Sequence, residues 1–518
     1  MSDKIVNTFQ ARRQLTEDMN GLSATQSEAE LLSRVRAIAQ NYEPLLVLST
    51  LTKYLDNSSS QVRGGLGRLA TLLPYDETVI VLRKEAANRG NPTQTRITAA
   101  MILERFLEAE LAPGLMSDLK DPETVVMQSL QEALAESHEN HYILLEYVRQ
   151  MRQENEQVAH QVMDLLGRLD GADQPELLRL IAYDMREGVA LAALERLGAI
   201  RQGEAAQAAA SALYTLQHNL KPELAQTAER TLRKLRFLGV RYEPTSEEGW
   251  RALITHSTLD GTQDLWFLRS GPDASQNLLI GLRINASAGV LETFGSEAIE
   301  SQYLPAQRSV GEMVSIALTS GPPTVFLEVP VDYARWRLEQ AVAAHWRQPK
   351  PKPLPEEYTF YNPSLCLAGK AELPVQLDEL FVSGPVLWKK SRSQLEEITA
   401  TLLRHPAMAG WFFQNNRMLA AAARLSAKDE PAFRSALVTL KRELFTAQVE
   451  QALGVEIQAG LLAQAGWLAI AGHPQHAQHA VFLAEGFHHI APVDHPLVEM
   501  MLEIGLLLLM KRKESRLG

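Results

Sequence analysis

Histidines gather near the end of the chain, in the segment GHPQHAQHAVFLAEGFHH and just after it. Six of the 13 histidines of the sequence lie there: His473, His476, His479, His488, His489 and His495. Because His476 and His479 are three residues apart, a helix would place both imidazoles on one face. A zinc site needs a third ligand that is held rigidly, and this spacing supplies two. We therefore assign no metal ligand from the sequence and expect surface and helix-end histidines, with a metal site as the alternative.

The same segment contains a Glu-x-x-His pair, formed by Glu485 and His488. A di-iron carboxylate centre in a helical bundle needs this pair twice, together with two further glutamates. The segment has one copy, so the spacing predicts no di-iron centre.

A second cluster with possible chemistry is the basic run RTLRKLRFLGVR. Its spacing of i, i+3 and i+4 places Arg230, Arg233 and Lys234 on one helix face, where an anionic partner such as nucleic acid or an acidic peptide could dock. The alternative, which we prefer, is a solvated last helical turn whose cations complement the helix dipole.

Residues for nucleophilic or acid–base catalysis do not form a recognisable motif. Cys366 lies in PSLCLAG, an apolar context that indicates burial. The motifs G-x-S-x-G, G-x4-G-K-[ST], G-x-G-x-x-G and H-E-x-x-H do not occur. His256, Asp260, Asp264 and Glu292 could be assembled into a site, but turns and strand ends are where such residues are expected. The sequence therefore assigns no catalytic residue and no cofactor.

Composition limits the possible classes of protein. The chain has 518 residues, 46% of them hydrophobic and 22% charged, which predicts about three globular domains. Its one cysteine excludes an intramolecular disulfide and a multi-cysteine metal site. The 51 basic and 62 acidic residues give a net charge of −11, the wrong sign for a dedicated nucleic-acid or membrane-surface binder.

Neither end of the chain indicates a membrane or an export route. The start, MSDKIVNTFQARRQ, lacks the apolar core of a secretory signal. The most lipid-like stretch, Ile504–Met510, has seven residues, against about 20 needed to span a bilayer. We interpret it as part of a buried last helix, with a membrane-surface anchor as the alternative, and expect a soluble cytoplasmic protein.

The distribution of aromatic residues indicates separate regions of the chain, and the folds of these regions must position the candidate side chains named above. All seven Trp lie at or after Trp250, and the first 239 residues are rich in strong helix formers. After residue 240, four apolar runs separated by turn residues predict strands, and they are Trp250–His256, Asp264–Ser270, Asn277–Ile284 and Thr324–Pro330. We expect Trp266, Phe267 and Trp346 to lie in the core, or to anchor an interface if they are exposed.

The rest of the chain is predicted to be helical apart from a spacer and an irregular stretch. Asp332–Gln348 reads as an amphipathic helix, and Pro349–Pro355 as a stiff spacer. After an irregular stretch to about residue 390, a capping box at Ser393 and Glu396 starts a helix. Further helices are expected at 430–454, 456–472 and 474–490. The predicted regions are 1–40 (helical or partly disordered), 41–240 (helical), 241–390 (α+β) and 391–518 (helical).

In the helical region, a polar turn followed by the start of a helix recurs along the chain; we call the residue with which each such helix pattern begins its opening. Six openings recur every 30 to 35 residues, at Val62, Thr95, Val125, Val158, Val189 and Leu224. Each is followed four residues later by a position that can face the same side: Leu66, Ala99, Ser129, Val162, Ala193 and Ala228. This period fits two helices and two turns, which predicts a stacked solenoid. A generic antiparallel bundle of similar hairpins is the alternative.

Several of these segments resemble HEAT repeats. The resemblance is carried by Asp56, Val62 and Arg63, by T-R-x2-A-A at 95–100 and by D-P-E-T-V at 121–125. More narrowly, these segments are similar to the short bacterial HEAT-like repeats that are also found in phycobilisome lyases. The resemblance covers about residues 40–240. Arg63 and Arg96 match the arginine position of the family, whereas the other four repeats have Val126, Ala159, Ala190 and Ala225 there.

Together these observations predict a mainly α protein: a HEAT/armadillo-like α-solenoid of helical hairpins, then a small α+β domain, then a C-terminal helical domain. The resemblance implies that the solenoid binds another macromolecule along a concave face. We expect a non-enzymatic scaffold or adaptor with a protein partner and no nucleic acid or membrane partner. The alternative is an enzyme, either a HEAT-like lyase or a hydrolase with its site in the α+β region.

Overall fold

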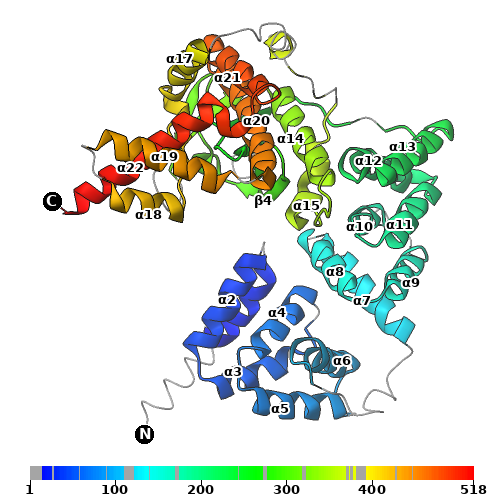
Figure 1. Cartoon of the computed structure of the whole chain (residues 1–518). Helices are drawn as coiled ribbons and strands as arrows, with labels where there is room; N and C mark the ends of the chain where they lie inside the picture. Colours follow the sequence, from blue (N-terminus) through cyan, green and yellow to red (C-terminus); the bar gives the residue numbers. More distant parts are fainter. Residues whose placement is uncertain are drawn as a thin grey trace. The chain divides into compact units, whose positions relative to one another are not determined.

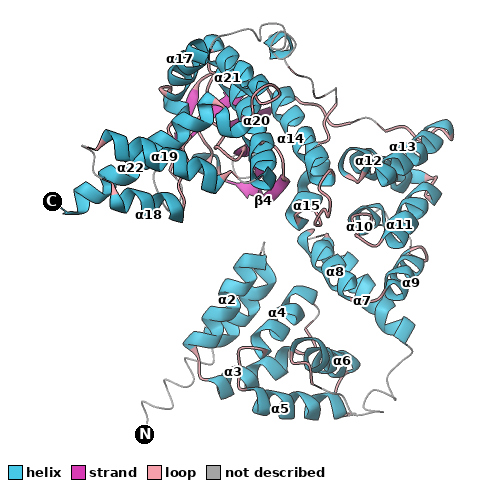
Figure 2. Cartoon of the chain, viewed as in Figure 1, coloured by secondary structure: helices cyan, strands magenta, loops and turns pink. Residues whose placement is uncertain are grey.

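The computed structural model describes residues 14–25, 28–57, 59–88, 90–109, 122–138, 140–169, 174–242, 244–271, 277–317, 323–368, 371, 373, 377–380, 392–425, 429–445 and 447–517 (Figure 1). The described part is mainly helical and contains a six-stranded antiparallel sheet (Figure 2). The chain forms two compact units: Met1–Leu216 with Gln226–Tyr242, and Gln217–Ala225 with Glu243–Gly518. The regions predicted as 241–390 and 391–518 therefore lie in one unit.

The first unit consists of short helices in the described residues. Residues 14–20 are helical, and the elements that follow are η1 (Gly21–Ala24), α2 (Glu28–Asn41), α3 (Pro44–Leu51), η2 (Thr52–Tyr54), α4 (Ser60–Ala70), α5 (Tyr75–Ala87), α6 (Thr93–Met101), the π-helical η3 (Ile102–Phe106), α7 (Pro122–Ser137), α8 (Tyr142–Gln153), α9 (Glu156–Leu166), α10 (Gln174–Ile181), α11 (Glu187–Ala199), α12 (Gly203–Asn219) and α13 (Pro222–Phe237). The helical part of the predicted segment 1–40 packs into this unit, because Leu15, Met19 and Leu22 are fully buried. Residues 1–13 and Asp121 lie outside the described residues.

All six repeat openings lie in the first turn of a helix, on α4, α6, α7, α9, α11 and α13. The positions four residues later are buried in five of the six helices, and Ser129 on α7 is half-buried. The predicted apolar face of each opening helix is thus the face that packs. The periodicity prediction is confirmed at the level of helices and buried faces.

Arginine side chains of the first unit donate hydrogen bonds to backbone carbonyls near helix ends and turns. The two arginines that match the HEAT pattern do this locally: Arg63 donates to the carbonyl of Asn57 (2.7 Å) and Arg96 to that of Ala86 (2.9 Å). In a later hairpin Arg186 donates to the carbonyl of Glu154, 2.6 Å away, while Asp184 holds its guanidinium. Arg186 thus binds a backbone carbonyl as Arg63 and Arg96 do, although it stands at a different position relative to its helix.

The second unit is built around the sheet, in strand order β4-β3-β2-β1-β6-β5. The strands are β1 (Trp250–Thr255), β2 (Thr262–Arg269), β3 (Asn277–Asn285), β4 (Gly289–Ile299), β5 (Met313–Ile316) and β6 (Thr324–Val329). The four predicted strand runs are confirmed as β1, β2, β3 and β6, whereas β4 and β5 were not predicted. Trp266 and Phe267 lie in the core as expected, and Trp266 packs on Phe294 and Phe326.

Helices follow the sheet in the chain, and α14 (Val331–Trp346) and α15 (Glu356–Leu365) among them pack on it. The other described helices are α17 (Arg392–Leu403), α18 (Asn416–Arg424), α19 (Glu430–Leu444), α20 (Ala447–Ile470), α21 (Pro474–Gly486) and α22 (Pro496–Leu517), with short turns η4 (Ser301–Tyr303), η6 (Pro406–Met408) and η7 (Pro492–Asp494). The prediction of an irregular stretch from 356 is wrong at α15, which is helical despite Pro363. The predicted break at Gly454 is also wrong, because α20 runs through it and a Cβ there would lie 2.7 Å from Pro492. Gly454 serves close packing instead of ending a helix.

The C-terminal helices and the sheet share one core. α14 packs against β1, β3 and β4. From α20, the indole of Trp467 donates to the carbonyl of Ile254 (3.3 Å), and the Gln464 side chain accepts from the backbone of Ser257 (2.8 Å). The Trp411 indole donates to the carbonyl of Ser257 (2.9 Å). These buried bonds to the end of β1 explain why the α+β region and the C-terminal helices form one unit.

Among the described helices, one is long and apolar enough to cross a membrane, and it is part of α20. This stretch is Ala452–Ile470, and 56% of it is buried inside the protein. A helix that packs on a sheet and on neighbouring helices has the same composition.

Candidate functional site

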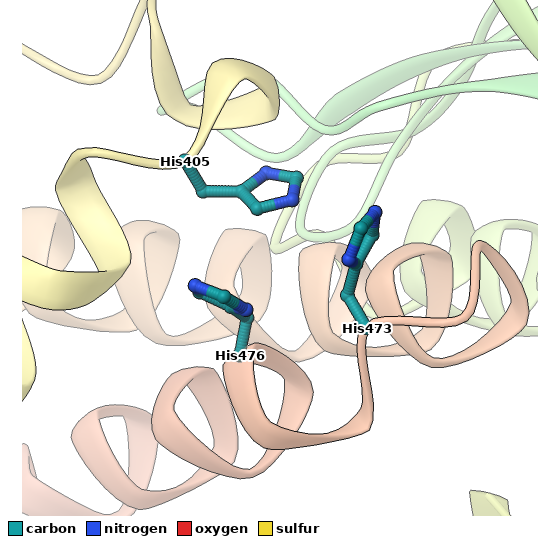
Figure 3. Close-up of side chains that lie close together, drawn as sticks. All are labelled: His405, His473 and His476. Carbon is teal, nitrogen blue, oxygen red and sulfur yellow. The ribbon is translucent and has the colours of Figure 1, made fainter.

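Three histidines of the second unit come together, and one of them is far away in sequence. The ligand-capable nitrogen atoms of His405, His473 and His476 all lie within 4.8 Å of one another. The ring centroid of His405 is 4.6 Å from that of His473 and 4.8 Å from that of His476. Figure 3 shows the three side chains directed into one space between two chain segments. We call this group the histidine trio.

The backbone fixes where each member of the trio starts. His405 follows α17, and its Nδ1 accepts a hydrogen bond from the backbone N–H of Ala407 (3.2 Å), which caps η6. Gly472 ends α20 with φ of +81°, a conformation that favours glycine. The N–H of His473 then returns to the carbonyl of Leu468 (2.8 Å). His476 lies in the first turn of α21, one turn beyond His473.

The surroundings of His405 favour its neutral imidazole. Burial, and then the neighbouring His473 and His476, lower the pKa of His405 below its usual value. Because Nδ1 of His405 accepts a hydrogen bond, its Nε2 is the atom that remains for a ligand. All three side chains are half-buried and so remain reachable from solvent.

The other histidines of the predicted cluster are placed elsewhere. His488 bonds to Gln458 (2.7 Å), and His495 is fully buried against Phe487. His479 lies next to the trio, with its ring centroid 6.2 Å from that of His476. Sequence reasoning missed His405, because it carries no local motif and stands 68 residues before His473.

A second candidate site is a cavity of about 320 Å³ in the first unit. Its lining comes from four of the six repeat-opening helices, α4, α6, α7 and α9, together with η3 and α8. Ile97, Met101, Val158 and Val162 supply apolar surface. We call this space the hairpin cavity.

Ion pairs engage the carboxylates of Glu146 and Glu154 at the hairpin cavity. Glu146 faces Arg149 (2.8 Å) and Arg68 (3.4 Å), and Glu154 faces Arg105 (2.6 Å). Arginine guanidinium groups therefore already engage both carboxylates. The pairs with Arg68 and Arg105 link α8 and the turn after it to α4 and η3, whereas the pair with Arg149 lies within α8. This arrangement does not resemble an acid–base catalytic set.

The phenol of Tyr147 lines the hairpin cavity, and it has no hydrogen-bond partner among the described residues. Burial raises its pKa above the usual value for tyrosine, so the group is a neutral hydroxyl at neutral pH. A hydroxyl in a largely apolar wall can donate one hydrogen bond to a ligand.

The basic residues predicted on one helix face do lie together on α13 and are exposed. Arg233 pairs with Glu229 (2.6 Å), and Arg230 bonds to the Thr227 side chain (3.1 Å). The charge of Arg233 is thereby balanced, which weakens the attraction of this face for an anion. Lys234 shares the face with both arginines.

The residues considered for catalysis in the α+β region do not meet as a site. Asp264 and Glu292 share Arg283, at 2.9 and 3.2 Å, in a ladder across β2, β3 and β4. Asp260 closes the β1–β2 turn by accepting from the backbone of Thr262 (3.2 Å).

The remaining two candidates have structural contacts. His256 packs edge-on against Trp467. Cys366 is half-buried, and its Sγ accepts from the Asn219 side chain (3.6 Å).

No family model, curated protein or solved structure matches the chain. The function therefore has to be argued from these residues and their geometry.

Proposed function

We propose that the protein is a non-enzymatic scaffold whose first unit, a HEAT-like α-solenoid, binds a segment of another protein. The observation that carries the proposal is the hairpin cavity. Four opening helices from successive repeats meet at it, which is where a helical-repeat protein presents its binding side chains. A cytoplasmic location fits this proposal.

The chemistry of the hairpin cavity suggests what the partner inserts. Apolar side chains such as Ile97 and Val158 favour an apolar or aromatic side chain, and the Tyr147 hydroxyl offers one hydrogen bond to a carbonyl or polar group beside it. The paired charges at the edge of the cavity would fix the position of the bound segment more than they would raise its affinity.

An enzyme is the second hypothesis, and the same cavity speaks against it. Catalytic sites bring together titratable groups with matched, perturbed pKa values. Here Glu146 and Glu154 are paired with arginines, and the pKa of Tyr147 moves away from neutrality.

The test is photo-crosslinking from the cavity. A photoreactive amino acid replaces Ile97, which lines the cavity on α6, and in a matched protein it replaces Ile80, which is 67% exposed on α5 outside the cavity. The two proteins are irradiated in a lysate of the native host. Proteins captured are identified by mass spectrometry, purified and titrated against the wild type.

A partner captured from position 97 and not from position 80 is the expected result. The purified partner should bind the wild type and Ile80→Arg, and bind Ile97→Arg at least tenfold more weakly. Equal capture from both positions, or a partner whose affinity is unchanged by Ile97→Arg, would overturn the proposal.

A further inference from the structure

We infer that His405, His473 and His476 form a binding site for a divalent transition-metal ion, with Zn²⁺ as the expected occupant. The inference rests on the convergence of three imidazoles whose nitrogen atoms lie within 4.8 Å of one another. It concerns the second unit and is independent of the scaffold proposal.

The donor set matches the preference of Zn²⁺ and not that of harder ions. Neutral imidazole suits Zn²⁺, Cu²⁺ and Ni²⁺, whereas Mg²⁺ and Ca²⁺ take oxygen ligands. Three histidines with an open fourth position are the arrangement found in one class of zinc sites, where water or a substrate completes the tetrahedron.

The trio is partly preorganised and needs a small closure. In a tetrahedral site with metal–nitrogen distances of about 2.0 to 2.1 Å, the ligand nitrogens lie about 3.4 Å apart. The ligand nitrogens therefore have to approach one another by up to about 1.4 Å, which half-buried side chains reach by rotation. His405 already presents Nε2, because its Nδ1 is engaged by the backbone of Ala407. A backbone hydrogen bond of this kind fixes the ring of a metal-binding histidine.

The site would connect two separate segments of the second unit. His405 stands after α17, while His473 and His476 open α21 (Figure 3). A ligand that binds the folded protein alone raises its melting temperature with concentration. Metal binding should therefore show as a thermal shift that depends on all three side chains.

The experiment uses the full chain without a polyhistidine tag, freed of metal with a chelator. Equilibrium dialysis against Zn²⁺ alone gives stoichiometry and affinity, and Co²⁺ gives an absorption spectrum that reports tetrahedral coordination. The variants are His405→Ala, His473→Ala and His476→Ala. His405→Asn keeps an oxygen acceptor for the Ala407 N–H while it removes the ring. His488→Ala and His489→Ala are the matched controls, since both are exposed histidines after α21.

The expected result is one Zn²⁺ per chain, an intense visible Co²⁺ spectrum and a rise in Tm with Zn²⁺. Each trio variant, His405→Asn included, should lower the affinity at least tenfold and abolish the spectrum, and the controls should behave as the wild type. Sub-stoichiometric Zn²⁺, an octahedral Co²⁺ spectrum, or equal losses in controls and trio variants would overturn the inference. Stability of every variant without metal, followed by circular dichroism, separates loss of ligand from loss of fold.

Discussion

The imidazole of His495 stacks on the phenyl ring of Phe487, with the ring centroids 4.2 Å apart and the planes parallel. His495 is fully buried, and its Nδ1 accepts from the backbone N–H of Leu497 (3.2 Å), which caps the start of α22. Burial lowers the pKa of His495 to about 4, although the carbonyl of Leu483 partly opposes this. The side chain is therefore a neutral structural element.

This contact predicts a loss of stability in mild acid. The unfolded chain takes up a proton at His495 below its ordinary pKa of 6.5, whereas the folded chain does so only near pH 4. The free energy of unfolding of the second unit should therefore fall as pH drops from 6.5 to 4, by up to about 3 kcal/mol from this group. Urea unfolding at several pH values measures it. His495→Asn keeps an acceptor for Leu497 and should flatten the dependence; an unchanged slope would contradict the assignment.

Because Gly466 of α20 packs closely on Tyr333 of α14, adding one methyl group at Gly466 should lower the stability of the second unit. A Cβ at Gly466 would lie 2.3 Å from the Tyr333 hydroxyl oxygen, and Tyr333 is fully buried. We expect Gly466→Ala to destabilise the second unit by about 1–3 kcal/mol through overpacking. Gly410→Ala, where the added Cβ meets nothing within 4 Å, should change stability by less than about 0.5 kcal/mol.

A double-mutant cycle sharpens this prediction. The Tyr333 hydroxyl oxygen is buried without a partner among the described residues, so Tyr333→Phe should cost little. It also removes the oxygen nearest to the added methyl, and the pair Gly466→Ala with Tyr333→Phe should therefore be more stable than additivity gives. Strict additivity in urea unfolding would show that the hydroxyl is not what the methyl meets.

The ion pair between Arg63 on α4 and Glu132 on α7 predicts an asymmetric stability effect. Arg63 is buried, and burial lowers its pKa even though Glu132 and Glu136 oppose the shift. Glu132→Gln removes the carboxylate that lies 3.0 Å from this guanidinium, while Glu136 stays in place, and should cost about 2 kcal/mol, below the range for fully buried pairs. The exposed pair Arg34–Glu30 on α2 is the control: Glu30→Gln should cost about 0.5 kcal/mol or less. Equal costs would mean that Arg63 is hydrated.

The hairpin cavity predicts a substitution that affects binding without affecting stability. The Tyr147 hydroxyl has no partner among the described residues, so Tyr147→Phe should leave the melting temperature unchanged or slightly raised. If the partner captured from position 97 bonds to this hydroxyl, its affinity should fall by about tenfold, the value of one hydrogen bond. Isothermal titration measures the affinity. A loss in the free energy of unfolding as large as the loss in binding free energy would point to a structural role.

Local patterns predicted those elements that carry their own signal. The openings at Val62 and Val158 are confirmed as helix starts, since polar turns and apolar spacing are properties of a short window. β4 was missed because it is an edge strand with a mostly exposed pattern, and β5 because it has four residues. α15 was missed because its proline and aromatic residues contradict helix propensity, which tertiary packing overrides.

Sites were harder to predict than elements because they join distant segments. His473 and His476 drew attention by number, yet the third member of the trio comes from the end of α17. The hairpin cavity lies between four of the helices that the sequence period of 30 to 35 residues predicted. Tyr147, however, belongs to α8, which that period does not mark. Neither His405 nor Tyr147 has a local signal, so packing alone identifies them.

The bonds from Gln464, Trp467 and Trp411 to the end of β1 also set an order of events during synthesis. The last strand of the sheet, β6, leaves the ribosome more than 100 residues before α20. Until α20 is made, Ile254 and Ser257 at the end of β1 therefore lack the hydrogen bonds from Trp467 and Gln464. The helices of the first unit pack largely on neighbours in the chain and can fold as they emerge. A chain that stops before Gln464 should therefore keep a folded first unit and expose an unfinished sheet to chaperones and proteases.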